Sequence, residues 1–242
     1  MKRSTLFSIF MRSLTIQVSF NFRRMQNLGF AFTMFPLIAE QRKDRREMEV
    51  FLARHLQMFN THPYLVSSVI GSVARIEEEA CTPGSAEDLK KALMGPYAAI
   101  GDSFFWGALR SFSAVGAVIV AFTGTLTAPL AFLLLYSPFH LWVRGKGFLE
   151  GYRRGKSGID FIRGLDLPGA AGRIRFLSLI LIGVLAAMAV EMACRPRNFL
   201  PEIPARAAAL GLLILFSLGV HKGISPVKIL YGMTLLCMVI SF

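Results

Sequence analysis

Apolar residues gather into long runs in the second half of the chain, whereas charges interrupt shorter apolar stretches in the first half. The longest run, residues 114–143, contains no formally charged side chain. It exceeds the ~20 residues that a helix needs to cross ~30 Å of hydrocarbon. Pro129 and Pro138 lie inside the run, so we expect a kink or an early helix end there. The pattern predicts an integral membrane protein whose segments cross or enter a bilayer.

Three further apolar segments follow toward the carboxyl end of the chain. Residues 176–194 are interrupted only by Glu191, while residues 205–220 and 226–242 are shorter. The short turn 221–223 joins the last two, which favours an antiparallel helical hairpin. Because both are short for a perpendicular span, tilting or local thinning of the bilayer is needed.

The first 110 residues predict helices that lie on the membrane or enter it only partly. Residues 6–22 are typical of an amphipathic helix at the membrane surface. Residues 26–39 are apolar but have the length of a re-entrant or interfacial segment. The charge run 42–47 indicates the solvated start of a helix. Apolar positions at helical spacing follow over 48–59, and the helix should stop before Pro63 because proline pushes the preceding residue out of helical geometry.

Residues 93–110 combine an acidic side chain with residues that interrupt helices. Before them, residues 64–79 predict a helix, and Ser85 with Asp88 resembles a capping box that opens the next one. Gly95-Pro96 should then break the helix, and Gly101-Asp102-Ser103 should break or bend it again. A carboxylate between apolar flanks usually faces a cavity or a partner charge and marks a substrate or ion route. The alternative is that Asp102 only caps a helix.

Composition and charge support the membrane assignment. Apolar residues make up 54% of the 242 and charged residues only 17%, against about 25% in typical soluble domains. The 27 basic residues exceed the 15 acidic ones. Such an excess attracts nucleic acid or anionic membranes, and the lipid-length runs decide for the membrane and against nucleic acid. Residues 144–175 hold 8 basic and 3 acidic side chains, so the positive-inside rule predicts a cytoplasmic loop with short helices.

Motifs for catalysis and metal binding are missing from the sequence. It contains no GxxxxGK[ST] phosphate loop, no HExxH and no CxxC, and its four histidines do not have metal-ligand spacing. We therefore expect no catalytic residue, no metal and no cofactor, and the chain by itself is not expected to be an enzyme.

Four motifs resemble the IID component of mannose-family sugar phosphotransferase systems. They are SFNFRRMQNLGFAFTMFPLI (19–38), FNTHPYL (59–65), MGPYAAIGDSFFWGALR (94–110) and SPFHLWVRGKGFLEGYRRG (137–155). The similarity covers about residues 10–160 in family order. It implies an all-α, multi-pass permease subunit of a bacterial inner membrane, with transmembrane, re-entrant and amphipathic helices.

The resemblance also implies partners and a division of labour. A IID protein assembles with a membrane-embedded IIC protein, while soluble IIA and IIB proteins relay phosphate from phosphoenolpyruvate to the sugar. The expected assembly is a hetero-oligomer that carries a hexose-type sugar by alternating access. No histidine of this chain should take part in the phosphate relay.

The family motifs assign expected roles to particular residues. The substrate path or membrane-depth core is expected at Asn60, Thr61, His62, Pro63, Glu77, Glu78, Gly101, Asp102 and Ser103. Contacts with IIB or with anionic lipid are expected at Arg144, Arg153 and Arg154.

We expect one IID-type membrane domain over residues 1–242. Its parts are an amphipathic and re-entrant core region (1–110), a transmembrane region (111–143), a basic cytoplasmic loop (144–175) and transmembrane helices (176–242). The alternative function is a non-transporting scaffold or regulatory paralogue of the same fold, since the passage from Cys194 to Ala205 is shorter than in many family members. An ion channel has little support because no ring-forming filter sequence is present.

Overall fold

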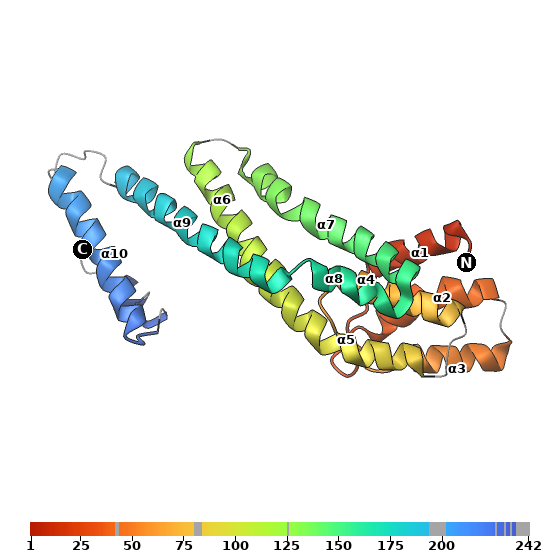
Figure 1. The fold of residues 1–242 in the computed structure, drawn as a ribbon. Coiled ribbons are helices and arrows are strands. Elements are labelled where there is room, and N and C mark those ends of the chain that lie inside the picture. The colour runs from red at the N-terminus through yellow and green to blue at the C-terminus, as the bar shows by residue number, and fades with distance from the viewer. Residues whose placement is uncertain are drawn as a thin grey trace. The chain divides into compact units, whose positions relative to one another are not determined.

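The structure, a computed structural model, describes residues 1–41, 44–79, 84–124, 126–193, 202–225, 227–229, 231–232 and 234–235. All named secondary-structure elements within these ranges are helices, which confirms the predicted all-α class (Figure 1). The chain divides into two compact units, Met1–Leu181 and Ile182–Phe242. All of the predicted site residues belong to the first unit.

The chain begins with α1 (Arg3–Ser13) and α2 (Asn27–Gln41), which pack against each other. α1 is shorter than the amphipathic helix expected over 6–22, because turns follow it. The hydroxyl of Thr15 donates to the carbonyl of Arg12 at 2.9 Å, and such local bonds compete with helix continuation. The apolar segment expected at 26–39 corresponds to α2.

The described part of the charge run, Asp44 to Glu47, is the capped start of α3 (Arg45–His55), as predicted, and residues 42 and 43 lie outside the described residues. The backbone N–H of Glu47 donates to the Asp44 carboxylate at 2.7 Å, and the Glu47 carboxylate accepts from the Asp44 N–H at 3.2 Å. This reciprocal arrangement is a capping box. The capping box expected at Ser85 is wrong: Ser85 is already helical, and Gly84 with φ +90° precedes it without a side-chain cap.

The helix α4 (Val66–Glu78) is buried along almost its whole length and packs closely on α7 (Ala128–Arg154). A Cβ at Gly71 would lie 2.2 Å from the Phe148 carbonyl oxygen, and one at Gly151 would lie 2.4 Å from that of Ser68. The two backbones are therefore in direct contact, which only glycine permits at these positions.

The segment expected to be broken twice is continuous helix. α5 (Ser85–Gly101) passes through Pro96, and at Asp102 the chain enters a π-helix, η1 (Asp102–Leu109), that leads directly into α6 (Arg110–Phe122). The break predicted at Gly95-Pro96 is therefore wrong. At Gly101–Ser103, where a break or a bend was predicted, the helix does not end, but it bends between α5 and α6 (Figure 1). A change of helical pitch takes the place of the second break, because a π-turn accommodates one extra residue without ending the helix.

The long apolar run 114–143 forms the two facing arms of a helical hairpin (Figure 1). α6 ends at Phe122 and α7 begins at Ala128, and the two helices pack against each other. The early helix end expected inside this run is confirmed, since α6 ends before Pro129 and α7 begins with that proline in its first turn. Hydropathy alone does not register the turn between the two helices. Pro138 lies inside α7 without ending it.

Among the described residues, two helical stretches are by length and composition able to cross a bilayer, Ser85–Phe122 and Ala128–Met192. The second includes most of the stretch 144–175, which was expected to be mainly loop. α7 continues to Arg154, and η2 (Gly155–Gly158), α8 (Ile159–Gly164) and α9 (Leu167–Ala193) follow. Its cytoplasmic location stays a prediction.

The second unit contains the end of α9 and α10 (Glu202–His221), which corresponds to the expected segment 205–220. Most of its expected hairpin partner, 226–242, lies outside the described residues, as do the three cysteines.

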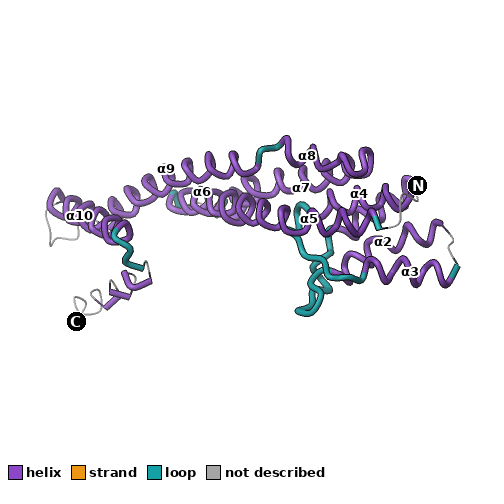
Figure 2. The backbone as a smooth tube through the Cα atoms, turned by 60° about the horizontal axis from the view of Figure 1, so that its bottom comes forward, coloured by secondary structure: helices purple, strands orange, loops and turns teal. Residues whose placement is uncertain are grey.

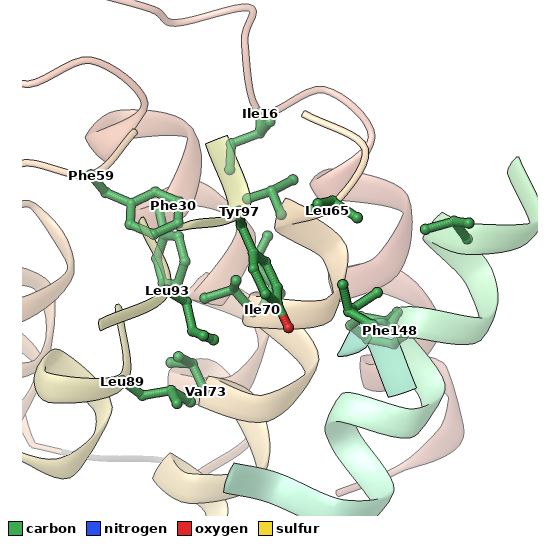
Figure 3. Close-up of a cluster of buried hydrophobic side chains, with 14 of the residues drawn as sticks. Ile16, Phe30, Phe59, Leu65, Ile70, Val73, Leu89, Leu93, Tyr97 and Phe148 are labelled. Atoms are coloured by element: carbon green, nitrogen blue, oxygen red, sulfur yellow. The ribbon is translucent and has the colours of Figure 1, made fainter. Parts of the chain in front are cut away.

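The hydrophobic core of the first unit surrounds α4 (Figure 3). Ile70 and Val73 of α4 are fully buried. Around them lie Phe30 of α2, Leu93 of α5 and Phe148 of α7. α4 thus occupies the centre of the bundle that positions the predicted site residues.

We predict that Gly151→Ala destabilises the protein while Gly145→Ala does not. A methyl group at Gly151 would overlap the α4 backbone, and overpacking of this kind costs about 1–3 kcal/mol. Gly145 lies on the same helix, and a methyl group added there would have no atom within 4 Å, so alanine should be neutral or stabilising. Thermal unfolding of the detergent-solubilised variants measures both effects. Equal midpoints for the two variants would contradict the close approach of α4 and α7.

Candidate functional site

The loop that precedes α4 is held in place by a buried side-chain amide. Gln26 donates from Nε2 to the Thr61 carbonyl oxygen at 2.7 Å, and its Oε1 accepts from the Thr61 N–H at 3.1 Å. The Gln26 N–H also donates to the Phe59 carbonyl at 2.8 Å. Since Gln26 and Thr61 are both buried, these bonds fix the backbone of the Asn60–Pro63 run against the loop after α1 (Figure 2).

His62, in the family motif at 59–65, packs directly on the family motif at 94–110. Its side chain is 1% exposed and lies directly on the backbone of Gly101, where a Cβ would be 2.3 Å from the Cβ and Cγ atoms of His62. The imidazole stacks on Phe105 with ring centroids 5.1 Å apart and contacts Trp106 at 4.8 Å. The contact requires glycine at 101, because any side chain there would displace the imidazole.

Burial decides the charge state of His62. It lowers the pKa of the imidazole to about 3, and the positive charge of Arg144 and the neighbouring His140 act in the same direction. His62 Nδ1 accepts from the Tyr64 N–H at 3.2 Å, which is consistent with a neutral ring. His62 is therefore uncharged at physiological pH.

Asp102 and Ser103 occupy the first two positions of the π-helix η1. Asp102 is exposed, and its carboxylate has no hydrogen-bond or ion-pair partner among the described residues. Ser103 accepts from Nη2 of Arg175 on α9, at 2.8 Å to its hydroxyl oxygen and 3.2 Å to its carbonyl. The sequence analysis did not identify Arg175 as the partner of Ser103. A cation next to an apolar helical run was the available signal, because such a charge normally has a polar partner.

A row of polar and aromatic side chains on α7 covers the other side of the loop. Tyr136, His140 and Arg144 recur every four residues, so they share one face of the helix. Tyr64 stacks on His140 with centroids 4.4 Å apart, and its hydroxyl lies 3.1 Å from that of Tyr136. The i, i+4, i+8 spacing is the signal that sequence reasoning overlooked.

Arg144 belongs to this loop rather than to an open surface. Its Nη2 donates to the Pro63 carbonyl oxygen at 3.1 Å, and its guanidinium lies 4.6 Å from the centroid of the Tyr64 ring. A cation over an aromatic face is attracted by the quadrupole of the ring. The expected contact of Arg144 with IIB or lipid stays a prediction, but its head group already holds the loop.

Glu77 and Glu78 lie at the opposite end of α4 from this cluster. α4 is 13 residues long, which separates its ends by about 20 Å at 1.5 Å per residue. Glu77 pairs with Arg54 at 3.0 Å and lies 3.3 Å from His55. Glu78 accepts from the Tyr152 hydroxyl at 2.6 Å and pairs with the amino group of Met1. The structure therefore does not bring the acidic pair to the His62 cluster.

Arg153 and Arg154 lie exposed in the last turn of α7. Arg154 pairs with Glu150 at 2.8 Å. Among the described residues, no group of three or more His, Cys, Asp or Glu side chains is placed to hold a metal ion. The cluster around His62 is built from amide, hydroxyl, carboxylate, guanidinium and aromatic groups, which can recognise polar ligands through hydrogen bonds.

The whole chain, residues 1–242, matches the model of the family described as PTS system mannose/fructose/sorbose family IID component. The fructose permease IID component of Bacillus subtilis (strain 168) is 29% identical to it, over 95% of this chain and 92% of that protein. The mannose-specific EIID component of Escherichia coli (strain K12) is 37% identical, over 69% of this chain and 59% of that protein.

Two solved structures share the fold. One, a cryo-electron-microscopy structure of the mannose transporter ManYZ in complex with microcin E492, contains a chain that superposes with a TM-score of 0.62 at 26% identity, covering 99% of this chain and 96% of that one. Another, described as a membrane protein, superposes with a TM-score of 0.72 at 26% identity, over 98% and 96% of the two chains.

We predict that Gly101→Ala displaces His62, whereas Gly95→Ala on the same helix does not. Gly95 has no atom within 4 Å of an added Cβ, so it controls for the helical preference of alanine. Displacement of the ring should cost about 1–3 kcal/mol of stability and change the fluorescence of Trp106. In a Trp142→Phe background, Trp106 is the remaining tryptophan of the chain. An emission spectrum unchanged by Gly101→Ala would refute the contact.

We also predict a pH dependence of stability that arises from His62. Because its pKa is about 3 in the folded protein and about 6.5 when unfolded, the unfolded chain binds the proton first, and stability falls as the pH drops below 6.5. At pH 5 the loss from this group is about 2 kcal/mol.

Unfolding midpoints of the wild type and of His62→Gln at pH 7 and pH 5 measure the stability that protonation of His62 costs. The variant should lose less stability on acidification than the wild type. His221→Gln, at an exposed position, serves as the control and should follow the wild type. A wild-type loss that His62→Gln leaves undiminished would show that other groups cause it.

Proposed function

This chain belongs to the mannose/fructose/sorbose phosphotransferase-system family of IID components, and we propose that its His62 cluster forms part of the path along which the sugar crosses the membrane. As a IID component it is a membrane subunit of a sugar transporter. In the proposed assembly it pairs with a IIC protein in the bacterial inner membrane as a multi-pass subunit, and IIA and IIB supply the phosphate. The hexose is phosphorylated by IIB as it is delivered, and this chain takes no part in that chemistry.

The observation that carries the proposal is the direct packing of His62 on Gly101. It joins the Asn60–Pro63 loop to the first turn of η1. Near this joint the amide of Asn60 and the carboxylate of Asp102 have no partner among the described residues, and the buried hydroxyl of Thr61 has none either. An amide and a carboxylate are suited to sugar hydroxyls, because between them they donate and accept hydrogen bonds.

The environment of these groups suits a hydroxylated, uncharged ligand. His62 is neutral, so the joint presents no imidazolium charge. The guanidiniums of Arg144 and Arg175 are already directed to Pro63 and Ser103. Trp106, at 37% exposure, adds an apolar ring next to His62. Asp102 therefore contributes the free negative charge, which favours donors such as sugar hydroxyls over anionic ligands.

The exposure of Asp102 supports a partner at this position. A lipid-facing carboxylate is costly, so such groups normally face a protein partner or a water-filled cavity. In the proposed complex the IIC subunit covers η1, and sugar passes between the two chains. The alternative function, a scaffold that binds IIC without transport, shares this contact and differs only in uptake.

The test is phosphoenolpyruvate-dependent sugar uptake in cells that express the cognate IIA, IIB and IIC proteins with or without this chain. We predict that uptake requires the chain and that Asp102→Asn lowers it roughly 10–100-fold, because hydrogen bonds to a charged group contribute about 1.5–3 kcal/mol. Asp88→Asn makes the same chemical change at an exposed site on α5 and should transport normally.

Membrane abundance and copurification with IIC are measured for each variant, so that a folding defect is not mistaken for a transport defect. If Asp102→Asn transports as well as Asp88→Asn, the proposed path is wrong. If the chain binds IIC stably while uptake never appears, the scaffold function replaces the transport function.

A further inference from the structure

We propose that a second site, remote from the His62 cluster, binds a phosphate group in a basic pocket where α4 and α7 end. The pocket is a cavity of about 320 Å³. It is lined by Arg75, Ile76, Glu79, Arg153, Arg154, Gly155 and Lys156. Four of these side chains are cations and one is an acid. The proposal does not depend on the proposed transport path.

The charges at the pocket are only partly compensated by the protein. Arg75 is held by Glu79 at 2.6 Å and by Glu78 at 3.7 Å, and Arg154 is held by Glu150. Arg153 and Lys156 have no ion pair among the described residues. Like charges that converge on one cavity repel each other, and an anion inside the cavity removes that repulsion.

The local backbone keeps the cations around the cavity. Gly155 has φ +56° and ψ −122°, a backbone conformation that residues other than glycine rarely adopt. This reversal ends α7 between Arg153 and Lys156, so that the helix and η2 each contribute one free cation. Gly155 also lies against the stem of Arg75, since a Cβ there would be 3.6 Å from Arg75 Cγ.

Phosphate is the anion that suits these groups. Guanidiniums bind phosphate oxygens with paired hydrogen bonds, and an ammonium adds a point charge. A water molecule takes about 30 Å³ of liquid volume, so the cavity has the room of about ten waters, enough for a phosphate with a small substituent such as glycerol.

Helix C-termini carry partial negative charge, and the ends of α4 and α7 therefore reduce the local repulsion. The partial negative charge at helix ends explains why cations occur in the last turns of α4 and α7. It does not explain Lys156, which lies beyond α7 in η2. The same partial charges weaken anion binding, so we expect modest affinity. Both a free phosphate compound and the phosphodiester of an anionic lipid provide the required group.

The experiment measures thermal stabilisation of the full-length chain, purified with its IIC partner, in nanodiscs of neutral lipid. In one arm sn-glycerol 1-phosphate is added, with sodium chloride at equal ionic strength as the control. In the other arm, phosphatidylglycerol replaces part of the neutral lipid. A ligand at about five times its Kd should raise the midpoint by about 2–4 °C.

The variants are Arg153→Gln with Lys156→Gln, and Arg163→Gln as a matched control at an exposed cation outside the pocket. The double variant should lose the shift and the control should keep it. A shift in the first arm identifies a soluble phosphate compound, and a shift in the second arm alone identifies the lipid headgroup. Both outcomes support the site.

Three outcomes overturn the proposal. They are no shift in either arm, a shift that chloride reproduces, and a shift that the double variant retains. If the double variant instead weakens binding of IIB while neither arm gives a shift, the pocket is a protein-docking surface and not a phosphate site. Both substituted side chains are exposed, so the double variant is expected to fold normally. Its unfolding midpoint without ligand, compared with that of the wild type, tests whether it does.

Discussion

The structure of the first unit depends on the burial of α4. All of its residues except Arg75 and Glu78 are buried, so nearly every face of the helix meets protein. Its contact with α7 brings backbone against backbone at Gly71 and Gly151. Protein interiors are close-packed and transmit displacement instead of absorbing it. The position of α4 therefore sets the positions of the segments at both of its ends.

These two ends have different chemistry, and α4 keeps them about 20 Å apart. At its beginning, the His62 loop contacts the π-helix through ring and backbone contacts that leave Asn60 and Asp102 without partners in the described chain. At its end lie carboxylates and cations, some of them paired, as in the contact of Glu77 with Arg54, while Arg153 and Lys156 have no ion pair among the described residues. The first end is thus suited to a neutral, hydroxylated ligand and the second to ionic interactions.

Local sequence signals predicted the helices near the site well. The helix expected over 64–79 is α4, Val66–Glu78. The helix expected to stop around 60–63 is α3, but it ends earlier, at His55. The charge run 42–47 was correctly interpreted as a helix start because capping is a local interaction. Helix starts and helix ends depend on residues that are neighbours in sequence, so they can be predicted from the sequence pattern.

Features that depend on tertiary contacts were not predictable in this way. Hydropathy does not distinguish a long span from a hairpin, and within 114–143 only the prolines indicated that a helix ends. Glycine and proline near 95–103 indicated breaks, whereas packing keeps the helix continuous and changes its pitch at Asp102. The contact of His62 with Gly101 was likewise invisible, because no periodicity relates two residues so far apart. The family motifs pointed to both residues without revealing that they touch.

The different kinds of contact also indicate where this subunit can move. Glycine-mediated contact between α4 and α7 leaves no space for sliding, since each backbone blocks the other. At the joint of the loop and η1, by contrast, flat rings stack on one another and the helix has π geometry. π-turns are rare and recur at functional sites. The joint at η1 is therefore held by ring stacking and an irregular helix, whereas the α4–α7 pair is held by backbone contact.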